Sequence, residues 1–275
     1  MNNSHDVLVI LTNYSRPQNM SRVIASWRDQ TVPCKIVVVD NTFVGDKEKK
    51  LRPDEERCGG IIVPEKYPYW MLGATRQADD VWRWTENSGC PCWLAPAVML
   101  YGHRYVLRAD DDFLPGRRAV EYLLDTARTL KDEFTTIGQI GRRAESGATA
   151  YVYHRGNVPR ETYAVRTDLT CRVSFMRAEV PMMALAWRNL LLKEHPSEET
   201  SRLVGVHDDF LLCCGGQKMT GWHSYLIPKT GDPETELVKE EIPNGPESVY
   251  KRPGHYVERD AMVALSVKAG WRSLC

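Results

Sequence analysis

The chain has 275 residues, and 36 Lys and Arg balance 36 Asp and Glu, so a protein that works mainly by coating polyanions is disfavoured although local basic patches remain open. With 43% hydrophobic residues it can bury a sizeable core as one large domain or two small ones, which excludes a disordered chain. The 19 Gly and 16 Pro exclude collagen-like and low-complexity chains.

The first third of the chain alternates strand and helix patterns, which is typical of a mostly parallel sheet. Residues 7–11 form a continuous apolar run that suits a strand buried on both faces, and residues 36–39 form the next such strand. Between them Pro17 suits a first helical position, and apolar residues recur at helical spacing. We therefore predict a helix over residues 17–29.

The pattern continues with a strand predicted at residues 61–63 and a helix over residues 73–85. A short strand over residues 105–107 runs into three consecutive aspartates. Pro115 then opens a further predicted helix whose apolar residues keep the 3.6-residue period.

The second half of the chain is less regular. Its arginines are concentrated between residues 142 and 188, where eight Arg and four acidic residues leave an excess of four positive charges. Residues 228–253 lack periodicity and are rich in Pro, Glu, Lys and Gly, which predicts a long loop. Strands are predicted over residues 150–153 and 169–176, and helices over residues 182–192 and 259–268.

The sequence shows neither a membrane-spanning segment nor a pattern of paired cysteines. No apolar run approaches the roughly 20 residues that cross a bilayer. The start of the chain is polar and lacks the basic and apolar segments of a signal peptide. We expect a soluble cytoplasmic protein (host cytoplasm if viral) without a membrane partner. The eight Cys include no C-x-x-C pair, which favours reduced thiols over a zinc site or disulfide framework.

Polar loops follow three of the predicted strands, at residues 12–16, 40–42 and 108–112. In an open α/β sheet, ligands bind beyond the carboxyl ends of the strands, because loops and helix N-termini converge there. One such loop alone is explained by the need to satisfy a strand end. Three together favour a ligand site.

Asp110, Asp111 and Asp112, here called the Asp triplet, follow one of these strands directly. Carboxylates so close repel one another unless a cation or hydrogen-bond donors neutralise them, so the triplet predicts Mg²⁺ or Mn²⁺, both of which prefer oxygen ligands. The alternative is an acidic, solvated turn in which one Asp caps the next helix.

The sequence opening resembles that of family-2-like glycosyltransferases of the GT-A fold, through residues 7–17, 30–31 and 36–41. The DxD motif of those enzymes matches the Asp triplet, and their later acidic motif resembles residues 206–210. The resemblance covers most of residues 7–215 and rests on the order of four motifs.

This resemblance implies a GT-A (Rossmann-like) α/β fold, a mostly parallel sheet flanked by helices in a single large domain. Residues 1–115 would form the nucleotide-sugar-binding half, and residues 116–275 the acceptor-binding and catalytic half with a C-terminal loop and helix. It implies a metal-dependent inverting hexosyltransferase that moves a sugar from a nucleotide-diphosphate sugar, with a UDP-sugar favoured, to an acceptor hydroxyl.

Donor-site residues follow from the resemblance, position by position. Asp112 would bind the Mn²⁺ or Mg²⁺ that bridges the diphosphate. His255 would add a metal ligand, with His223 competing for that place. Relatives often have glycine around residues 171–174, close to the donor sugar, so the sugar stays open. The nucleotide of the donor would contact Thr12, Tyr14, Arg16, Asp40, Arg76, Asp110 and Asp111.

The later acidic motif would supply the catalytic base. Asp209 is the candidate base that deprotonates the acceptor hydroxyl. Asp208 is the alternative, since the family pattern usually has Glu-Asp where this sequence has Asp-Asp. Either aspartate could instead be the N-cap of the helix that follows at residues 210–214.

The acceptor is open at this stage. The Arg-rich stretch and the Trp residues allow a hydroxymethylated pyrimidine base in DNA, since a small chain without a membrane anchor also resembles phage-type DNA-modifying glucosyltransferases; base flipping would then be required for duplex DNA. A glycan or small-molecule acceptor is the alternative. A non-catalytic sugar-nucleotide or nucleic-acid binding module is the alternative of another class. A sugar-phosphate nucleotidyltransferase is disfavoured, because residues 12–17 lack glycine.

Overall fold

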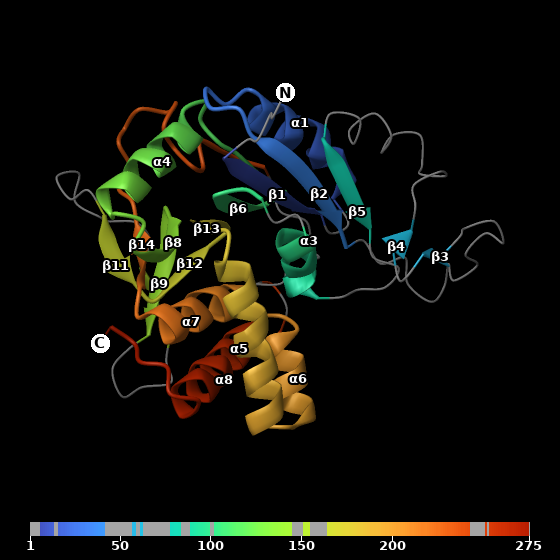
Figure 1. The fold of residues 1–275 in the computed structure, drawn as a ribbon, viewed down its shortest axis with the longest axis vertical. Coiled ribbons are helices and arrows are strands. Elements are labelled where there is room, and N and C mark those ends of the chain that lie inside the picture. The colour runs from blue at the N-terminus through green and yellow to red at the C-terminus, as the bar shows by residue number, and fades with distance from the viewer. Residues whose placement is uncertain are drawn as a thin grey trace.

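A central sheet of eight strands, within the residues described, organises the structure in a computed structural model of the chain (Figure 1). The structure describes residues 6–13, 16–41, 57–58, 61–62, 78–83, 89–99, 102–144, 151–154, 164–242, 251 and 253–274. The strands of the sheet lie in the order β11 (Val165–Thr167), β14 (His223–Leu226), β8 (Phe134–Gly138), β13 (Val173–Arg177), β6 (Tyr105–Asp110), β1 (Val7–Asn13), β2 (Lys35–Asp40) and β5 (Asp80–Arg83).

The sheet is mixed, with more parallel than antiparallel pairs. Strand β1 pairs in parallel with β2 and β6, β2 with β5, and β8 with β14. Strand β13 runs antiparallel between β6 and β8, and β11 is antiparallel to β14. The predicted class, a mostly parallel α/β sheet flanked by helices in one large domain, is confirmed.

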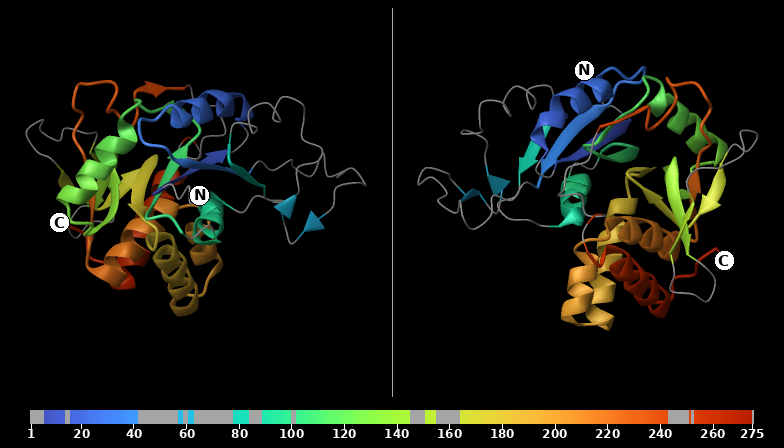
Figure 2. Two further views of the ribbon diagram at one scale, coloured as in Figure 1. Left: turned by 45° about the horizontal axis from the view of Figure 1, so that its top comes forward. Right: turned by 180° about the vertical axis from the view of Figure 1, so that it is seen from behind.

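Helices cover both faces of this sheet (Figures 1 and 2). Both faces must be covered because they are apolar, as strand β1 shows. Its fully buried side chains alternate between two apolar clusters. Leu8 and Ile10 join one cluster, whereas Val7, Val9 and Leu11 join the other. The first cluster includes α3 (Leu94–Met99), α5 (Val180–Glu194), α6 (Glu198–Val204), α7 (Asp208–Thr220) and α8 (His255–Lys268), and the second α1 (Pro17–Arg28) and α4 (Ala119–Thr129).

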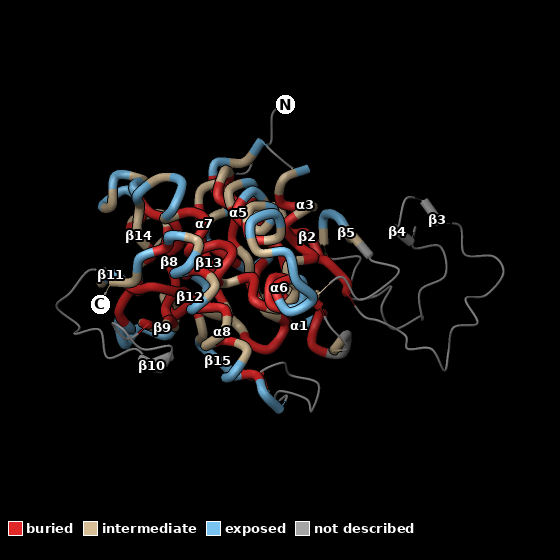
Figure 3. The backbone as a smooth tube through the Cα atoms, turned by 90° about the horizontal axis from the view of Figure 1, so that it is seen from below, coloured by how far each residue is buried: buried red, intermediate tan, exposed pale blue. Residues whose placement is uncertain are grey.

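Smaller elements flank the sheet. A three-stranded sheet places β9 (Ile140–Ala144) between β10 (Tyr151–His154) and β12 (Leu169–Cys171), and β7 (Phe113–Leu114) pairs with β15 (Glu240–Glu241). A 3₁₀ helix, η2 (Cys90–Trp93), precedes α3. The backbone tube is buried through the central strands and exposed mainly along the outer helices and loops (Figure 3).

Helix α7 lies close to its neighbours because it contains two adjacent glycines. A Cβ on Gly215 would lie 2.8 Å from the Cβ of Trp187 in α5. A Cβ on Gly216 would lie 2.2 Å from Cγ2 of Thr135 in β8. Only glycine permits this approach, so the pair fixes how near the C-terminal half of α7 lies to α5 and the sheet.

One predicted element before residue 86 was wrong where the structure describes it, and another is a strand outside the central sheet. Residues 80–83, predicted as helix, form the edge strand β5, since Val81 pairs with Val38 of the buried strand β2. The rest of that prediction lies mostly outside the described residues. Ile61 and Ile62 do form a strand, β4 (Ile61–Ile62), but it pairs with β3 (Arg57–Cys58) and not with the central sheet; Val63 lies outside the described residues.

Two later boundaries also differ. The helix expected from Pro115 begins at Ala119, because the intervening backbone bonds to another segment: the Gly116 N–H donates to the Glu236 carbonyl and the Arg118 N–H to the Glu234 carbonyl. The strand expected over residues 169–176 is divided into β12 and β13 at residue 172. The predicted strands at 7–11, 36–39, 105–107 and 150–153 and helices at 17–29, 182–192 and 259–268 are confirmed to within a few residues.

No helix among the residues described is long and apolar enough to cross a bilayer. Six cysteines in the part of the chain that the structure describes are free thiols, as predicted: Cys34, Cys90, Cys92, Cys171, Cys213 and Cys214. Burial raises the pKa of each, to about 12 for Cys34, Cys92 and Cys171. They are therefore protonated at neutral pH.

Candidate active site

The carboxyl ends of β6, β1 and β2 meet at one end of the sheet and bring together residues that the sequence places far apart. In the strand registers Thr12 lies opposite Asp110 and Asn13 opposite Asp40. The Asn13 amide donates to Asp40 Oδ1 at 2.9 Å, and the Thr12 hydroxyl lies 3.5 Å from the Ala109 carbonyl oxygen. The convergence expected from a parallel sheet is therefore present.

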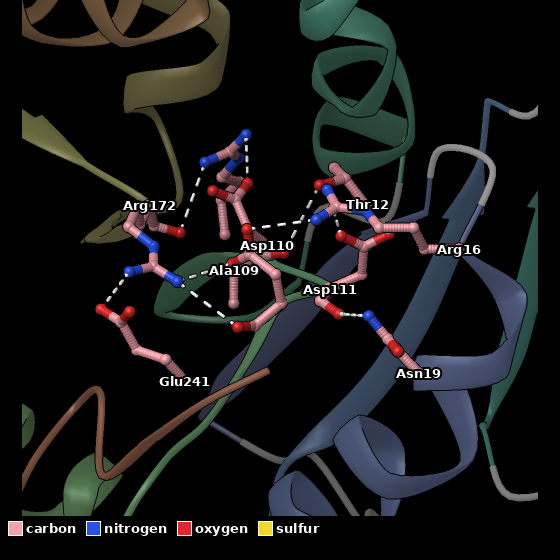
Figure 4. A network of polar contacts seen from close by, with 10 residues as sticks. Thr12, Arg16, Asn19, Ala109, Asp110, Asp111, Arg172 and Glu241 are labelled. Atoms are coloured by element: carbon pink, nitrogen blue, oxygen red, sulfur yellow. Dashed lines mark hydrogen bonds and ion pairs between the residues drawn. The ribbon is translucent and has the colours of Figure 1, made fainter. Parts of the chain in front are cut away.

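Arg16, just before α1, binds two members of the Asp triplet (Figure 4). Its guanidinium lies 2.6 Å from Asp111 Oδ1 and 3.2 Å from Asp112 Oδ2. The Asn19 amide donates to the Asp111 carbonyl at 3.0 Å. Asp111 is 1% exposed, so it is held behind Arg16 rather than in solvent. Such charge-assisted pairs are the strong class of hydrogen bond.

Arg172 holds the triplet from the opposite side, through both its backbone and its side chain (Figure 4). Its carbonyl accepts from the Asp110 N–H at 3.1 Å, while its guanidinium contacts Asp112 Oδ1 and Glu241 Oε1, each at 2.8 Å. The residue has φ of 66°, in the left-handed region, which costs a non-glycine residue about 1–2 kcal/mol. This turn separates β12 from β13 and aims the side chain at Asp112.

Arg108 joins the triplet to the second acidic motif. Its guanidinium lies 2.8 Å from Asp110 Oδ1 and 3.3 Å from Asp208 Oδ2. The Trp93 indole N–H also donates to Asp208 Oδ2, at 2.9 Å. A partly buried arginine of β6 thus connects the end of the sheet to the first turn of α7, and the two aspartates that it contacts are 98 positions apart in the sequence.

Burial raises the pKa of both carboxyls that contact Arg108. For Asp110 burial outweighs the attraction of Arg108, and the charge of Asp112 adds to the rise, which gives a pKa of about 6. For Asp208 burial is again the largest cause, opposed by Arg108 and reinforced by Asp209. Arg108 is therefore the principal positive charge that opposes the protonation of these two groups.

Asp209 has the opposite shift from its neighbour. Burial acts to raise its pKa, but the attraction and hydrogen bond of Arg259 in α8 outweigh burial, so the pKa falls below its ordinary value. Arg142 adds to this lowering, and the Cys171 thiol lies 3.6 Å from Asp209 Oδ2. The pKa values of two adjacent carboxyls in one helical turn are thus shifted in opposite directions.

The candidate metal ligands other than aspartate lie elsewhere. His255, the first residue of α8, is buried with its ring 5.8 Å from that of His207. His223 lies in β14, 3.4 Å from the Gln217 amide nitrogen. Across the part of the chain that the structure describes, no group of three His, Cys, Asp or Glu is arranged to hold a metal ion.

A divalent ion is nevertheless compatible with the donor set of the triplet. Asp112 and Asp110 offer the carboxylate oxygens that Mg²⁺ and Mn²⁺ prefer. Both carboxylates already contact arginines, so the protein can supply only a minority of the ligands. This fits an ion that arrives with phosphate oxygens, as Mg²⁺ commonly does, better than one bound by protein alone.

The structure thus brings most of the predicted residues to one place. Tyr14 and Arg76 lie outside the described residues. The two capping alternatives were wrong, because the N-caps of α4 and α7 are Arg118 and His207. The residues that sequence reasoning missed are basic or aromatic: Arg108, Arg259 and Trp93 carried no motif signal, whereas the departure from glycine near residue 172 was a signal for Arg172.

Comparisons with known proteins give only distant similarity. No protein-family profile matches the sequence, and no curated protein matches it. Among solved structures, the mannosyltransferase PcManGT from Pyrobaculum calidifontis, in complex with GDP-Man and Mn²⁺, aligns with a TM-score of 0.44 and 16% identity over 82% of this chain and 55% of its own. TarS from S. aureus aligns with a TM-score of 0.45 and 13% identity over 82% of this chain and 37% of its own. The chain therefore spans about half the length of the first protein and over a third of the second.

We predict that Arg108→Met destabilises the fold by about 3–5 kcal/mol near pH 8, because it leaves the buried Asp208 and the partly buried Asp110 without their shared cation. The pKa values of Asp110 and Asp208 in the folded state would rise further above their unfolded values. Stability from a raised carboxyl pKa is present at low pH and is lost as the pH rises through the folded pKa, so the deficit should be smallest near pH 4 and grow towards pH 8. Urea unfolding across this range measures it.

The matched control is Arg22→Met, which breaks an exposed ion pair with Glu240 at 2.7 Å. Exposed pairs contribute about 0–1 kcal/mol, so this variant should show a small deficit with little dependence on pH. An Arg108→Met deficit that stayed constant from pH 4 to pH 8 would contradict the assigned role of Arg108.

Proposed function

We propose that the chain is a metal-dependent inverting glycosyltransferase, which moves a sugar from a nucleotide-diphosphate sugar to an acceptor hydroxyl. The observation that carries this proposal is the Arg108 bridge between Asp110 and Asp208. It brings the acidic motif suited to a donor diphosphate and the acidic motif suited to a base to the same end of the sheet. The order of motifs resembling GT-A enzymes supports the same assignment.

The donor nucleotide would lie over the ends of β1 and β2. Thr12 and Asp40 are positioned there by their strands, and Arg16 is held at the start of α1 by the triplet. Tyr14 and Arg76 are assigned to the same pocket by sequence resemblance, and UDP is the favoured nucleotide on that ground. Guanidinium groups bind phosphate oxygens bidentately, which suits Arg16 to the diphosphate.

Asp112, assisted by Asp110, would hold the Mn²⁺ or Mg²⁺ ion, with His255 as a further candidate ligand. When bound, the ion would stabilise the negative charge that develops on the departing nucleoside diphosphate. The protein contributes to the same stabilisation, because the guanidinium groups of Arg16 and Arg172 lie beside Asp112.

Asp209 is the proposed base, with Asp208 as the alternative. The hydroxyl oxygen of the acceptor attacks the anomeric carbon of the sugar, the bond to the diphosphate breaks, and the hydroxyl proton passes to a carboxylate oxygen. Arg259 keeps Asp209 ionised, whereas Asp208 is held by Trp93 and Arg108. These contacts favour a structural role for Asp208, which holds Trp93 and Arg108 in place, and they favour Asp209 as the carboxylate that accepts the proton.

The acceptor that we propose to test first is a hydroxymethylated pyrimidine base in DNA, with glycans and small alcohols as the alternatives. The Arg-rich stretch supports an anionic acceptor, because one of its members lies near the proposed base. Arg142 lowers the pKa of Asp209, and its guanidinium carbon lies 5.9 Å from the ring centre of the exposed Tyr256.

We expect a nucleoside diphosphate to bind more tightly in the presence of Mn²⁺. We also expect Asp112→Ala to weaken the binding measured with Mn²⁺ at least about tenfold, which corresponds to about 1.4 kcal/mol. Calorimetric titration with UDP and with GDP, with and without Mn²⁺, measures both effects. Asp125→Ala, which removes an exposed carboxylate of α4, is the control and should bind like the wild type. Tight binding that ignored both the ion and Asp112→Ala would reject the proposed diphosphate site.

Replacement of the base should separate binding from transfer. We expect Asp209→Asn to keep the donor affinity of the wild type and to lose about 10²–10⁴-fold in transfer rate, the usual contribution of a general base. Transfer is followed by mass change on hydroxymethylated DNA, glycans and small alcohols. Asp208→Asn is the matched variant, and the larger loss of transfer in that variant would reassign the base to Asp208.

The pH dependence of transfer tests the Arg259 contact. Arg259 lowers the pKa of Asp209, and burial opposes it, so Arg259→Gln should raise that pKa. A base is inactive when protonated, and the acid limb of kcat/KM should therefore move to higher pH in the variant. The control is Arg202→Gln, which alters an exposed arginine of α6 that contacts Glu258 of α8, the helix that contains Arg259. An acid limb that did not move would show that Asp209 is not the titrating base.

A further inference from the structure

Arg172 has a more specific part in the site than its contribution to charge balance. Its guanidinium lies between Asp112 and Glu241, and its centre is 5.5 Å from the centre of the Phe113 ring. Its carbonyl oxygen accepts from the Asp110 N–H and lies 3.4 Å from an Arg108 guanidinium nitrogen. One residue in a left-handed conformation therefore contacts both ends of the Asp triplet.

The carboxylate that it contacts is nearly saturated with positive charge. Asp112 is buried, and Arg172 occupies one of its oxygens while Arg16 occupies the other. A divalent ion approaching Asp112 alone would have to displace one guanidinium or lie beside two of them. Because Asp112 is buried, both alternatives are electrostatically unfavourable.

A diphosphate changes this balance. Its oxygens can accept from the Arg172 guanidinium, which is suited to bidentate phosphate contacts, and so leave an Asp112 oxygen available to the ion. The ion and the diphosphate would then each favour the binding of the other, which is reciprocal by linkage.

We propose that Arg172 is a positioning residue that makes ion binding at Asp112 depend on the nucleoside diphosphate. In the absence of donor it is the counter-ion of Asp112, and when donor binds it turns from Asp112 to the diphosphate oxygens. This inference rests on the proposed function, because it takes the nucleoside diphosphate as ligand. It concerns the order and coupling of binding, which the proposed function leaves open.

The test compares Arg172→Gly and Arg172→Lys with the wild type. Glycine suits the left-handed backbone, so Arg172→Gly removes the charge without a steric penalty. Free Mn²⁺ is measured by electron paramagnetic resonance in the absence of nucleotide, and affinity for UDP or GDP by calorimetry with Mn²⁺ present. We expect Arg172→Gly to bind Mn²⁺ alone at least about tenfold more tightly than the wild type and the nucleotide at least about tenfold more weakly. Arg172→Lys, which keeps the charge but loses the bidentate contact, should lie between them.

Two controls separate the effect of the Arg172 charge from that of weaker contacts at β15. Glu241→Gln removes only the outer contact of Arg172, and Arg22→Ala removes the neighbouring exposed pair with Glu240; both should keep the wild-type affinity for Mn²⁺ alone. Equal affinity of Arg172→Gly and wild type for Mn²⁺ alone, or for the nucleotide, would overturn the inference and leave the proposed function intact. A wild type that binds neither UDP nor GDP, with or without Mn²⁺, would instead overturn the proposed function.

Discussion

The neutralisation of three consecutive aspartates by three arginines is the interaction on which this site depends. Asp111 and Asp112 are almost completely buried, and without nearby cations a cluster of carboxylates in a low-dielectric region would unfold locally or take up protons. The cations come from three separate segments: Arg16 precedes α1, Arg108 is in β6, and Arg172 lies between β12 and β13. The same pairs that satisfy the charges therefore hold these segments in register.

The sheet makes this meeting possible. Strand β1 is buried on both faces, so its carboxyl end is fixed between β6 and β2, and each neighbour delivers its own polar end. On the other side of the site, Gly215 and Gly216 let the C-terminal half of α7 lie against α5 and β8, and the first turn of the same helix contacts Arg108 through Asp208. The packing of apolar side chains, together with the two glycines of α7, thus sets the distances between the charged groups.

Sequence reasoning predicted the parts of this arrangement that depend on local pattern. The apolar run at residues 7–11, Pro17 at the start of α1, and an Asp triplet at a strand end are all visible in short windows. What it missed depends on long-range contacts: the partners Arg172 and Asp112 are 60 residues apart, and no periodicity indicates that they meet. Residues 80–83 were predicted as helix for a related reason, because the need of β2 for an edge partner overrides local propensity.

The contrast between Asp208 and Asp209 shows how neighbouring groups of one chemistry acquire different properties. The Asp208 side chain is 10% exposed and the Asp209 side chain 14%, and both contact an arginine, so the small difference in exposure does not explain their opposite pKa shifts. The difference lies in competition for the cation. Arg108 is shared between Asp208 and Asp110, and its attraction fails to offset burial, whereas the attraction of Arg259 for Asp209 is strong enough to do so. The pKa of Asp208 is therefore raised and that of Asp209 lowered, and such a separation of the pKa values of two neighbouring carboxyls is typical of acid-base sites.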